Sequence, residues 1–427
     1  MKRHLSEIGW VVGGQAITAL GTVVGVRVLT QALVPSAYGA VSLALGLSTL
    51  AVSLVAAPPT QAAIHFYPQA VVDGSPRELL YSILRYYRKM APWAVLVALA
   101  AAVAYVASGH GTPMLVFVLT LLFASDCWRS ANLSLLNAAR RQGRYALWSA
   151  GDSWSRPLAA TAAVLAFGQS PVAVLAAHVL VSVFLSSVFS YRLWPTDDTR
   201  SANEVAARSL RWDTRLWEYA LPLLPLGLVT WASSLGDRYI IGATLGLADA
   251  GVYAAVYGLS AMPFTLVNGT VEQGLRPIYQ TAVSRGDRVE ARRILVLWIG
   301  IVAAVCSCGV LVFTFGHDWI AALVVGKAYR HASGLMPWIS LGYAIRAASA
   351  VLERVPYAYG KTQRVLVIQI CGVAATAVVT PLGIFAFGLQ GAAMAVPVYF
   401  SFQFAAAALL ARRTIRESDA HAVPTFA

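Results

Sequence analysis

The sequence has 427 residues, of which 58% are hydrophobic and only 12% are charged. Its mean hydropathy of +0.65 excludes an ordinary soluble domain, because such a domain needs more polar residues to cover its surface. The net charge of +13 is divided among short connections between apolar runs, which argues against a nucleic-acid partner.

Apolar runs of about 20 residues, the length at which a helix crosses hydrocarbon, recur from end to end. Strands are not expected, because the runs do not alternate in polarity and backbone groups in lipid must be satisfied within helices. We predict an all-α integral membrane protein whose second helix bends near Pro58 and Pro59. The twelve expected transmembrane helices lie at about residues 6–29, 38–66, 88–107, 113–137, 146–167, 171–193, 217–246, 250–276, 291–315, 333–357, 363–386 and 389–411.

The basic residues predict how the chain is oriented. Connections on the side of the N-terminus carry clusters such as Arg140, Arg141 and Arg144, whereas the opposite side carries only Lys327 and Arg330. Positive charge favours the cytoplasmic side, so we predict a multi-pass protein with both termini in the cytoplasm. The longest outer connection, about residues 316–332, leaves no room for an external catalytic domain.

Residues 195–215 form the most polar connection, and we predict a cytoplasmic linker there between two lobes. The N-terminal six-helix lobe comprises residues 1–194, and the C-terminal lobe comprises residues 216–427 with a short cytoplasmic tail. The run 203–215 is compatible with a helix. Either Trp194, Trp212 and Trp217 anchor this segment at the membrane surface, or it is a plain solvated linker.

The two halves of the chain show an internal repeat. Six helices in each half is an even number, so the lobes are expected to share one orientation and to be pseudo-symmetric. The matching elements are Arg27 with Arg238, Gly46-Leu47-Ser48 with Gly258-Leu259-Ser260, Arg129 with Arg346, and Ala166-Phe167-Gly168 with Ala386-Phe387-Gly388.

Ionisable residues within the predicted spans are costly in lipid, so each is a candidate functional residue. The planar guanidinium of arginine suits phosphate and carboxylate groups. We therefore predict a cationic, substrate-binding cavity that contains Arg27, Arg129, Arg238 and Arg346. Asp237 adjoins Arg238 but its counterpart Arg27 has no acid within four residues, and Asp126 lies near Arg129 but its counterpart Arg346 has none. The charge lining is therefore expected to differ between the lobes.

Several other charges in the spans are spaced as helical pairs, three or four residues apart, and so share a helix face, whereas Asp237 and Glu353 each adjoin an arginine in the sequence. Such residues either hold helices together or couple transport to an ion. The candidates are Asp126, Asp152, Arg156, Asp237, Glu272, Arg276 and Glu353.

Catalytic motifs are not found in the sequence. Its seven histidines are dispersed, its four cysteines have neither zinc nor disulfide spacing, and it has no phosphate-binding loop for ATP. We expect no catalytic residue, no metal site and no cofactor, and the protein is not expected to be an enzyme.

Short motifs at the start of each half resemble a known family. In the second half they are Glu218-Tyr219-Ala220-Leu221-Pro222, Gly236-Asp237-Arg238-Tyr239 and Ala250-Gly251-Val252-Tyr253, and in the first half Arg27-Val28-Leu29 and Pro35-Ser36-Ala37-Tyr38-Gly39. They resemble Wzx-type polysaccharide flippases of the multidrug/oligosaccharidyl-lipid/polysaccharide (MOP) exporter superfamily.

The resemblance implies a MATE-like fold of two lobes around a V-shaped cavity lined by the first and seventh spans. It implies that undecaprenyl-diphosphate-linked oligosaccharide is moved from the cytoplasmic to the outer leaflet of a bacterial inner membrane, for O-antigen, capsule or exopolysaccharide assembly. Alternating access, coupled to a proton or sodium gradient, is the implied mechanism. Membrane lipids, a glycan polymerase and export machinery are the implied partners.

Three alternatives remain open from the sequence. The first is an ion-coupled exporter of small molecules or drugs in the same superfamily. The second is a major-facilitator-type carrier, which would need a basic motif between spans two and three that is missing here. The third is a membrane glycan polymerase or ligase, for which a large external loop with paired acids is expected.

Overall fold

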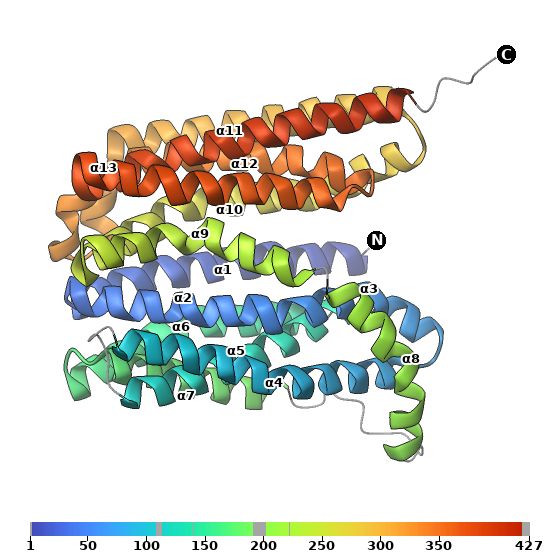
Figure 1. Ribbon diagram of the computed structural model, residues 1–427, viewed down its shortest axis with the longest axis horizontal. Helices are drawn as coiled ribbons and strands as arrows, with labels where there is room; N and C mark the ends of the chain where they lie inside the picture. The colour runs from blue at the N-terminus through green and yellow to red at the C-terminus, as the bar shows by residue number, and fades with distance from the viewer. Residues whose placement is uncertain (1, 108–112, 140, 191–201, 222, 421–427) are drawn as a thin grey trace. The chain divides into compact units, whose positions relative to one another are not determined.

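The computed structural model describes residues 2–107, 113–139, 141–190, 202–221 and 223–420 (Figure 1). Within these ranges every regular element is a helix, which confirms the predicted all-α fold. The elements are α1 (Lys2–Ala32), α2 (Pro35–Val55), α3 (Ala57–Val72), α4 (Pro76–Ala107), α5 (Pro113–Ala138), α6 (Gln142–Phe167), α7 (Pro171–Phe189), α8 (Ala202–Ala220), α9 (Leu223–Thr244), α10 (Leu247–Ser284), α11 (Arg288–Val324), the 3₁₀ helix η1 (Lys327–Leu335), α12 (Met336–Ala358) and α13 (Thr362–Ala420).

Each of the twelve predicted spans falls mainly on helical residues, although the span 171–193 extends past Phe189, the end of α7, into residues outside the described ranges. The expected bend in the second span is a break at Ala56, and Pro58 and Pro59 follow it at the start of α3. The last two predicted spans both lie within α13, which is interrupted where Phe387 and Gly388 leave the helical conformation. Gly388 has a φ of 57°, which suits glycine because it has no Cβ to clash.

Two sequence expectations about connections are wrong. The outer connection expected at 316–332 is helical over most of its length, because α11 continues to Val324 and η1 follows at Lys327. The seventh span, expected to begin at residue 217, is divided between α8, which ends at Ala220, and α9, which begins at Leu223. A proline at position 222 explains the division, since proline cannot donate within a helical ladder.

The helices are long and apolar enough for a multi-pass membrane protein. Among the described residues, seven helices pass a test of length and hydropathy for spanning a bilayer: α2, α5, α7, α10, α11, α12 with η1, and α13. Others, such as α6 and α9, carry charged residues within their length. Large hydrophobic side chains, including Val296, Leu311 and Phe315, are exposed on α11, where lipid would cover them.

Clustering of contacts divides the chain into an N-terminal unit, Met1–Trp231, and a C-terminal unit, Ala232–Ala427. In the N-terminal unit α1 packs on α6 through three glycines. A Cβ at Gly14, Gly21 or Gly25 would lie 2.5–2.6 Å from an atom of α6, so larger residues would separate the two helices.

The last part of the predicted linker is docked on the N-terminal unit. Residues 191–201 lie outside the described residues, while the expected helix is present as α8. Trp212 is buried against α3 and α4, so the alternative in which Trp212 anchors the linker at the lipid headgroups is wrong. Arg85 of α4 pairs with Asp213 at 2.6 Å, and Arg211 donates to Ser75 at 2.6 Å. The lobe boundaries themselves stay a prediction.

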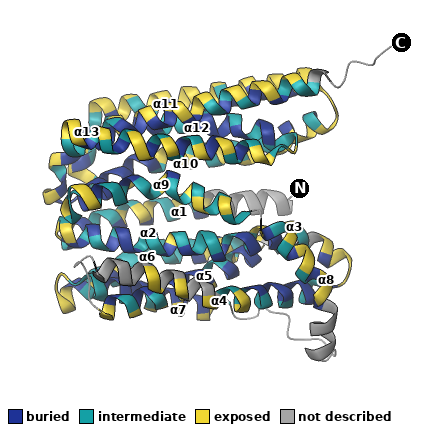
Figure 2. Ribbon diagram, in the orientation of Figure 1, coloured by how far each residue is buried: buried dark blue, intermediate teal, exposed yellow. Residues whose placement is uncertain are grey.

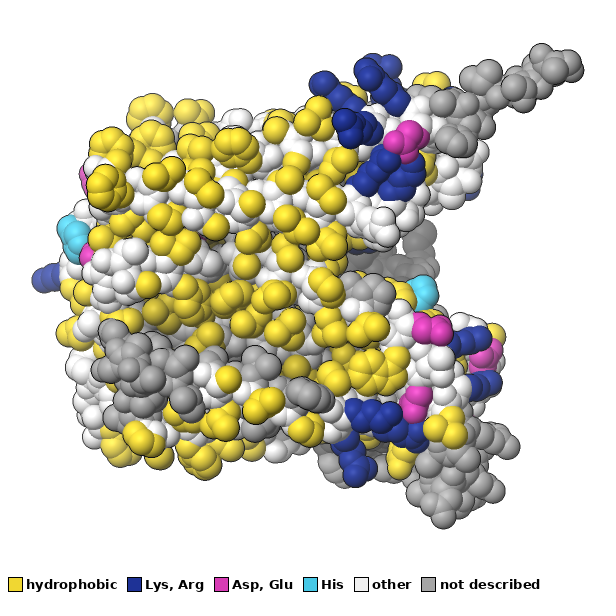
Figure 3. Space-filling view, viewed as in Figure 1, with side chains coloured by type: hydrophobic (Ala, Val, Ile, Leu, Met, Phe, Trp, Pro, Cys, Tyr) yellow, Lys and Arg dark blue, Asp and Glu magenta, His cyan; other side chains and the backbone are white. Residues whose placement is uncertain are grey.

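In the C-terminal unit, α10 is the most buried helix and α11 the most exposed (Figure 2). Figure 3 shows hydrophobic side chains over the visible faces of α11 and α13, and basic side chains gathered where α13 approaches the C-terminus. Gly342 lets α12 approach α13 closely, because a Cβ there would lie 2.5 Å from Val396. α12 and α13 carry most of the polar residues that form the site described next.

Candidate functional site

The N-terminal unit contains a closed network of four charges. Arg156 of α6 contacts Asp126 of α5 at 2.6 Å and Asp152 of its own helix at 2.8 Å. Arg129 of α5 lies 3.4 Å from Asp126 and 3.2 Å from Asp152. Each arginine therefore contacts both aspartates, and the two positive charges are balanced within the network.

Hydroxyl groups from two further helices complete this network. Ser48 of α2 donates to Asp126 at 2.9 Å, and Ser182 of α7 donates to it at 3.3 Å. Ser48 belongs to the Gly-Leu-Ser element of the sequence repeat. The network therefore links α2, α5, α6 and α7. Because its positive and negative charges balance, it has little net charge with which to bind a ligand.

Arg27 lies in α1 at a half-buried position, apart from the four-charge network. With the Gln31 amide oriented so that its oxygen faces the guanidinium, this oxygen accepts hydrogen bonds from Arg27 at 3.1 and 3.2 Å. A neutral amide orients the guanidinium without cancelling its charge. The proposed role of Arg27 in substrate binding stays a prediction.

In the C-terminal unit, Arg346 of α12 does have an acidic partner. Its Nη1 lies 3.1 Å from Glu353, two helical turns further along the same helix. The expected difference between Arg129 and Arg346 in acidic neighbours is therefore wrong, because the comparison considered only residues up to four positions away. Glu353 also accepts from Gln369 at 3.1 Å and from Gln403 at 3.3 Å, both on α13.

A second group of charges joins α10 to α12. Glu272 of α10 contacts Arg354 at 2.8 Å and Arg276 at 3.2 Å. Arg354 is the functional candidate that the sequence analysis did not include. It follows Arg346 by eight residues, about 12 Å along the helix axis, and this spacing places both on one face of α12.

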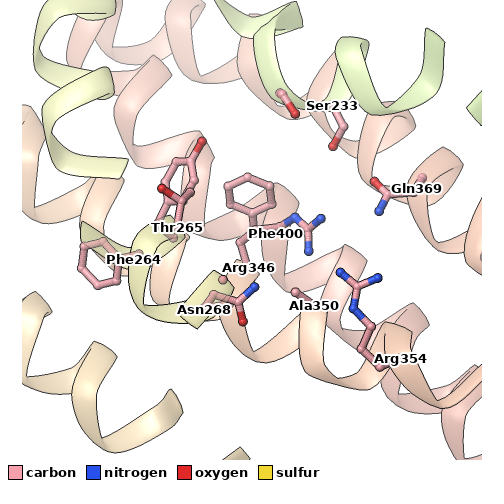
Figure 4. A pocket seen from close by; sticks show the side chains of 13 residues that line it. Ser233, Phe264, Thr265, Asn268, Arg346, Ala350, Arg354, Gln369 and Phe400 are labelled. Atoms are coloured by element: carbon pink, nitrogen blue, oxygen red, sulfur yellow. The ribbon is translucent and has the colours of Figure 1, made fainter. Parts of the chain in front are cut away.

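Arg346 and Arg354 line the same cavity, which has a volume of about 260 Å³. Figure 4 shows both guanidinium groups turned into this space, near the amides of Asn268 and Gln369. The cavity mixes cationic, amide, hydroxyl and aromatic groups. Its lining residues are Ser233, Ser234, Phe264, Thr265, Asn268, Gly269, Tyr343, Arg346, Ala347, Ala350, Arg354, Gln369 and Phe400.

Two arginines line this cavity, and no acidic residue is among the described residues that line it. Arg346 is paired with Glu353 and Arg354 with Glu272, and both glutamates lie outside the lining. The Nε of Arg354 and the amide oxygen of Asn268 are buried and have no hydrogen-bond partner among the described residues. Such groups are costly when unsatisfied, so the cavity is suited to an anionic ligand that also carries hydroxyl or amide groups.

Asp237 and Arg238 of α9 lie beside this cavity's wall. Asp237 is buried and accepts from the Arg238 backbone at 2.8 Å and from Tyr253 at 2.7 Å. The Arg238 guanidinium lies over the Tyr257 ring, 4.9 Å from its centroid. Arg238 itself is not among the residues that line the cavity, and its role in substrate binding stays a prediction.

Comparisons with solved structures show the fold to which this chain is similar. An inward-facing multidrug resistance MATE family transporter of the MOP superfamily superposes with a TM-score of 0.75 at 12% identity, covering 96% of both chains. A lipid II flippase, MurJ, superposes with a TM-score of 0.64 at 8% identity, covering 96% of this chain and 87% of the other. The Vibrio cholerae MATE transporter VcmN gives a TM-score of 0.61 at 12% identity, covering 98% and 99%.

These similarities confirm the predicted MATE-like architecture, and at such low identity they concern the fold alone. No curated protein sequence matches the chain. A family model described as polysaccharide biosynthesis protein matches residues 5–282, which is more than half of the sequence. The chain belongs to this polysaccharide biosynthesis protein family.

Proposed function

We propose that this protein is a flippase that moves polyprenyl-diphosphate-linked oligosaccharide from the cytoplasmic to the outer leaflet of the bacterial inner membrane. The observation that carries the proposal is the cavity lined by Arg346 and Arg354, in a polytopic member of a polysaccharide biosynthesis family. The solved structures with this fold include a lipid II flippase, whose substrate is also a lipid-linked saccharide precursor.

The chemistry of the cavity fits the polar end of such a substrate. A diphosphate is costly to bring into a bilayer unless cationic donors replace its water. Arg346 and Arg354 supply guanidinium groups, and the described lining holds no acidic side chain to repel an anion. Asn268 and Thr265 offer amide and hydroxyl groups to sugar hydroxyls, while the apolar polyprenyl chain stays in the lipid.

The remaining features of the proposal follow the family resemblance. Transport proceeds by alternating access, is coupled to a proton or sodium gradient, and supplies O-antigen, capsule or exopolysaccharide assembly. Both termini lie in the cytoplasm, and a glycan polymerase and export machinery use the product.

The decisive experiment is deletion of the gene, followed by measurement of which leaflet holds the lipid-linked oligosaccharide. Accumulation on the cytoplasmic leaflet, reversed by the wild-type gene, is expected. Normal export in the deletion strain would refute the proposal, unless a second flippase is shown to replace the protein.

Complementation with arginine variants tests the cavity directly. We expect Arg346→Gln and Arg354→Gln to lower export by about tenfold or more, because each removes a charge-assisted contact worth about 1.5–3 kcal/mol. Arg276→Gln is the matched control, since Arg276 contacts the same Glu272 as Arg354 but does not line the cavity. Equal export by all three variants, at equal protein levels, would show that the cavity takes no part in transport.

The same assay tests Arg27. We expect Arg27→Ala to abolish export while the protein remains in the membrane, because it removes a positive charge from a half-buried position in α1. Full export by this variant would exclude Arg27 from substrate binding.

An ion-coupled exporter of small molecules is the second candidate. It is favoured by the TM-score of 0.75 to a multidrug resistance transporter and by the aromatic part of the cavity wall, Phe264, Tyr343 and Phe400. Aromatic faces bind organic cations as well as sugars. Altered drug resistance in the deletion strain, with normal glycan export, would support this candidate over the flippase.

A further inference from the structure

A buried carboxylate in the C-terminal unit is surrounded by phenolic hydroxyl groups. Asp237 of α9 is 2% exposed. Tyr253 of α10 donates to its Oδ2 at 2.7 Å, and Tyr399 of α13 donates to the same oxygen at 3.4 Å. The backbone N–H of Arg238 donates to Oδ1 at 2.8 Å. Both carboxylate oxygens therefore accept hydrogen bonds, and the two side chains that donate to Oδ2 come from two other helices.

These hydroxyl groups continue to the wall of the cavity. Tyr399, which donates to Asp237, also lies next to the hydroxyl of Tyr257. Tyr257 is hydrogen bonded to Tyr343 at 3.1 Å, and Tyr343 lines the cavity. A phenol donates through its hydrogen and accepts through its oxygen, so a proton passed to one end of such a chain is released at the other. These three tyrosines thus form a row of hydroxyl groups from Asp237 to the cavity.

The surroundings favour a proton over a metal ion at Asp237. All three groups that contact the carboxylate point hydrogens toward it, whereas a sodium ion needs lone pairs. The Arg238 guanidinium repels any cation, and a sodium ion, which also needs several oxygen ligands, is disfavoured more than a proton, which needs one oxygen. A proton needs less rearrangement, because a protonated carboxyl donates to one phenol and that phenol turns its hydrogen elsewhere.

Protonation of Asp237 would also change the charge beside the substrate cavity. Arg238 lies over the Tyr257 ring, and its buried Nε has no hydrogen-bond partner in the described part of the chain. Neutralising Asp237 removes the nearest negative charge from Arg238. The titratable and charged groups that face Asp237 are Arg238 on α9, Tyr253 and Tyr257 on α10, Tyr343 on α12 and Tyr399 on α13, and Arg346 of α12 lies on the far side of Tyr343.

We propose that Asp237 is a proton-binding site that exchanges protons with the cavity of the C-terminal unit through Tyr399, Tyr257 and Tyr343. The proton enters at Tyr343 from cavity water, each hydroxyl passes one hydrogen on, and Asp237 gains one proton while every tyrosine returns to its neutral form. The consequence for transport, that this proton is the coupling ion, rests on the proposed function. The proton site itself does not.

Infrared difference spectroscopy of the purified full-length protein in lipid nanodiscs tests the site. A pH change is expected to produce a carboxylic-acid carbonyl band that shifts when aspartate is labelled with ¹³C and is lost in Asp237→Asn. Tyr343→Phe should keep the band but slow its appearance after a pH jump by about tenfold, because the replacement removes one hydrogen-bonded link. Tyr279→Phe is the matched control, since it removes a buried hydroxyl from α10 outside this chain of residues, and it should leave the rate unchanged.

The outcomes separate the two proposals. If the band is the same in the wild type and in Asp237→Asn, the proton site is refuted, whatever the protein transports. If Tyr343→Phe and Tyr279→Phe both exchange at the wild-type rate, the proton path is refuted even where Asp237→Asn fails to fold. If the band behaves as expected and the wild type moves no lipid-linked oligosaccharide in proteoliposomes, the proposed function fails and the proton site stands.

Discussion

Arg156 and Arg346 are both arginines at depth in an apolar helix, yet their surroundings give them different tasks. Arg156 contacts two aspartates and a serine, so its charge is fully used in holding α5, α6 and α7 together. Arg346 contacts one glutamate through one terminal nitrogen and faces a cavity. Removal of one partner from a buried ion pair leaves the other charge uncompensated, so Arg156 is expected to matter for stability. Arg346, which faces the cavity, is expected to matter for binding.

Arg156→Gln should therefore destabilise the protein by about 3–5 kcal/mol, because it leaves Asp126 and Asp152 with Arg129 as their one cationic partner. Arg276→Gln, at a position whose side chain is 42% exposed, should change stability by less than about 1 kcal/mol. Thermal unfolding of the two variants in the same detergent measures the difference. Equal melting temperatures would mean that the four-charge network is not a stabilising element.

Sequence spacing predicts part of this arrangement and misses the rest for a clear reason. The pairs Asp152 with Arg156 and Glu272 with Arg276 are confirmed, because residues four apart must share a helix face. Contacts between helices, such as Glu272 with Arg354, depend on how α10 packs against α12, and spacing within one helix carries no information about that. The same limit explains why the sequence predicts a cationic cavity with Arg346 but does not predict Arg354 as part of its wall.

At the scale of the element, small residues and breaks decide how the helices meet. α1 and α6 approach closely because Gly21 and Gly25 present no side chain to Trp154 and Pro157. The repeat found in the sequence reappears here. Gly168 at the end of α6 has a φ of 74°, and its counterpart Gly388 in α13 has a φ of 57°. Both glycines thus interrupt a helix with a positive φ, a backbone conformation that other residues rarely adopt. Glycine spacing predicts such ends, but it does not predict which helix faces which.

The α1 and α6 interface gives a prediction with a control in the same helix. A Cβ on Gly25 would lie 2.6 Å from the Pro157 ring, whereas one on Gly13 would meet nothing within 4 Å. Gly25→Ala should lower the melting temperature, since overpacking costs about 1–3 kcal/mol. Gly13→Ala should leave it unchanged or raise it, because alanine favours a helix by about 1 kcal/mol over glycine. The opposite order would show that α1 does not pack on α6 as described.

The docking of α8 leads to a prediction about local opening. Asp213 accepts from both Arg85 and Ser82 of α4, so Asp213→Asn weakens the contact that holds α8. We expect amide hydrogen exchange to become faster over residues 209–220 and to stay unchanged in α6. Glu218→Gln is the control, because Glu218 is an exposed acid on the same helix. Unchanged exchange in the Asp213 variant would show that Trp212 and its neighbours hold α8 without the ion pair.

For the molecule as a whole, the sequence predicts the fold class well because the bilayer restricts the choices. Each apolar run must form a helix, so composition and run length alone place most of the described residues of the predicted spans in helices. The ends are less well predicted. α4 begins at Pro76 and α11 continues to Val324, because polar and interfacial residues such as Arg85 and Trp319 continue the helix outside the apolar run. The arrangement of the two units does not follow from hydropathy, since a hydropathy pattern specifies no helix partner.

The orientation in the membrane is the prediction that belongs to this scale, and the C-terminal unit allows a sharp test. Ser284, at the end of α10, adjoins the basic connection that begins with Arg285, while Ala328 in η1 lies beside Lys327 on the predicted outer side. Both positions are exposed, so a cysteine at either is open to a reagent. In a variant without the four native cysteines, a membrane-impermeant maleimide added to intact spheroplasts should label Ala328→Cys and not Ser284→Cys, because positive charge is retained in the cytoplasm. Permeabilised cells should label both, and the reverse pattern in intact spheroplasts would place the basic connections outside and contradict the predicted topology.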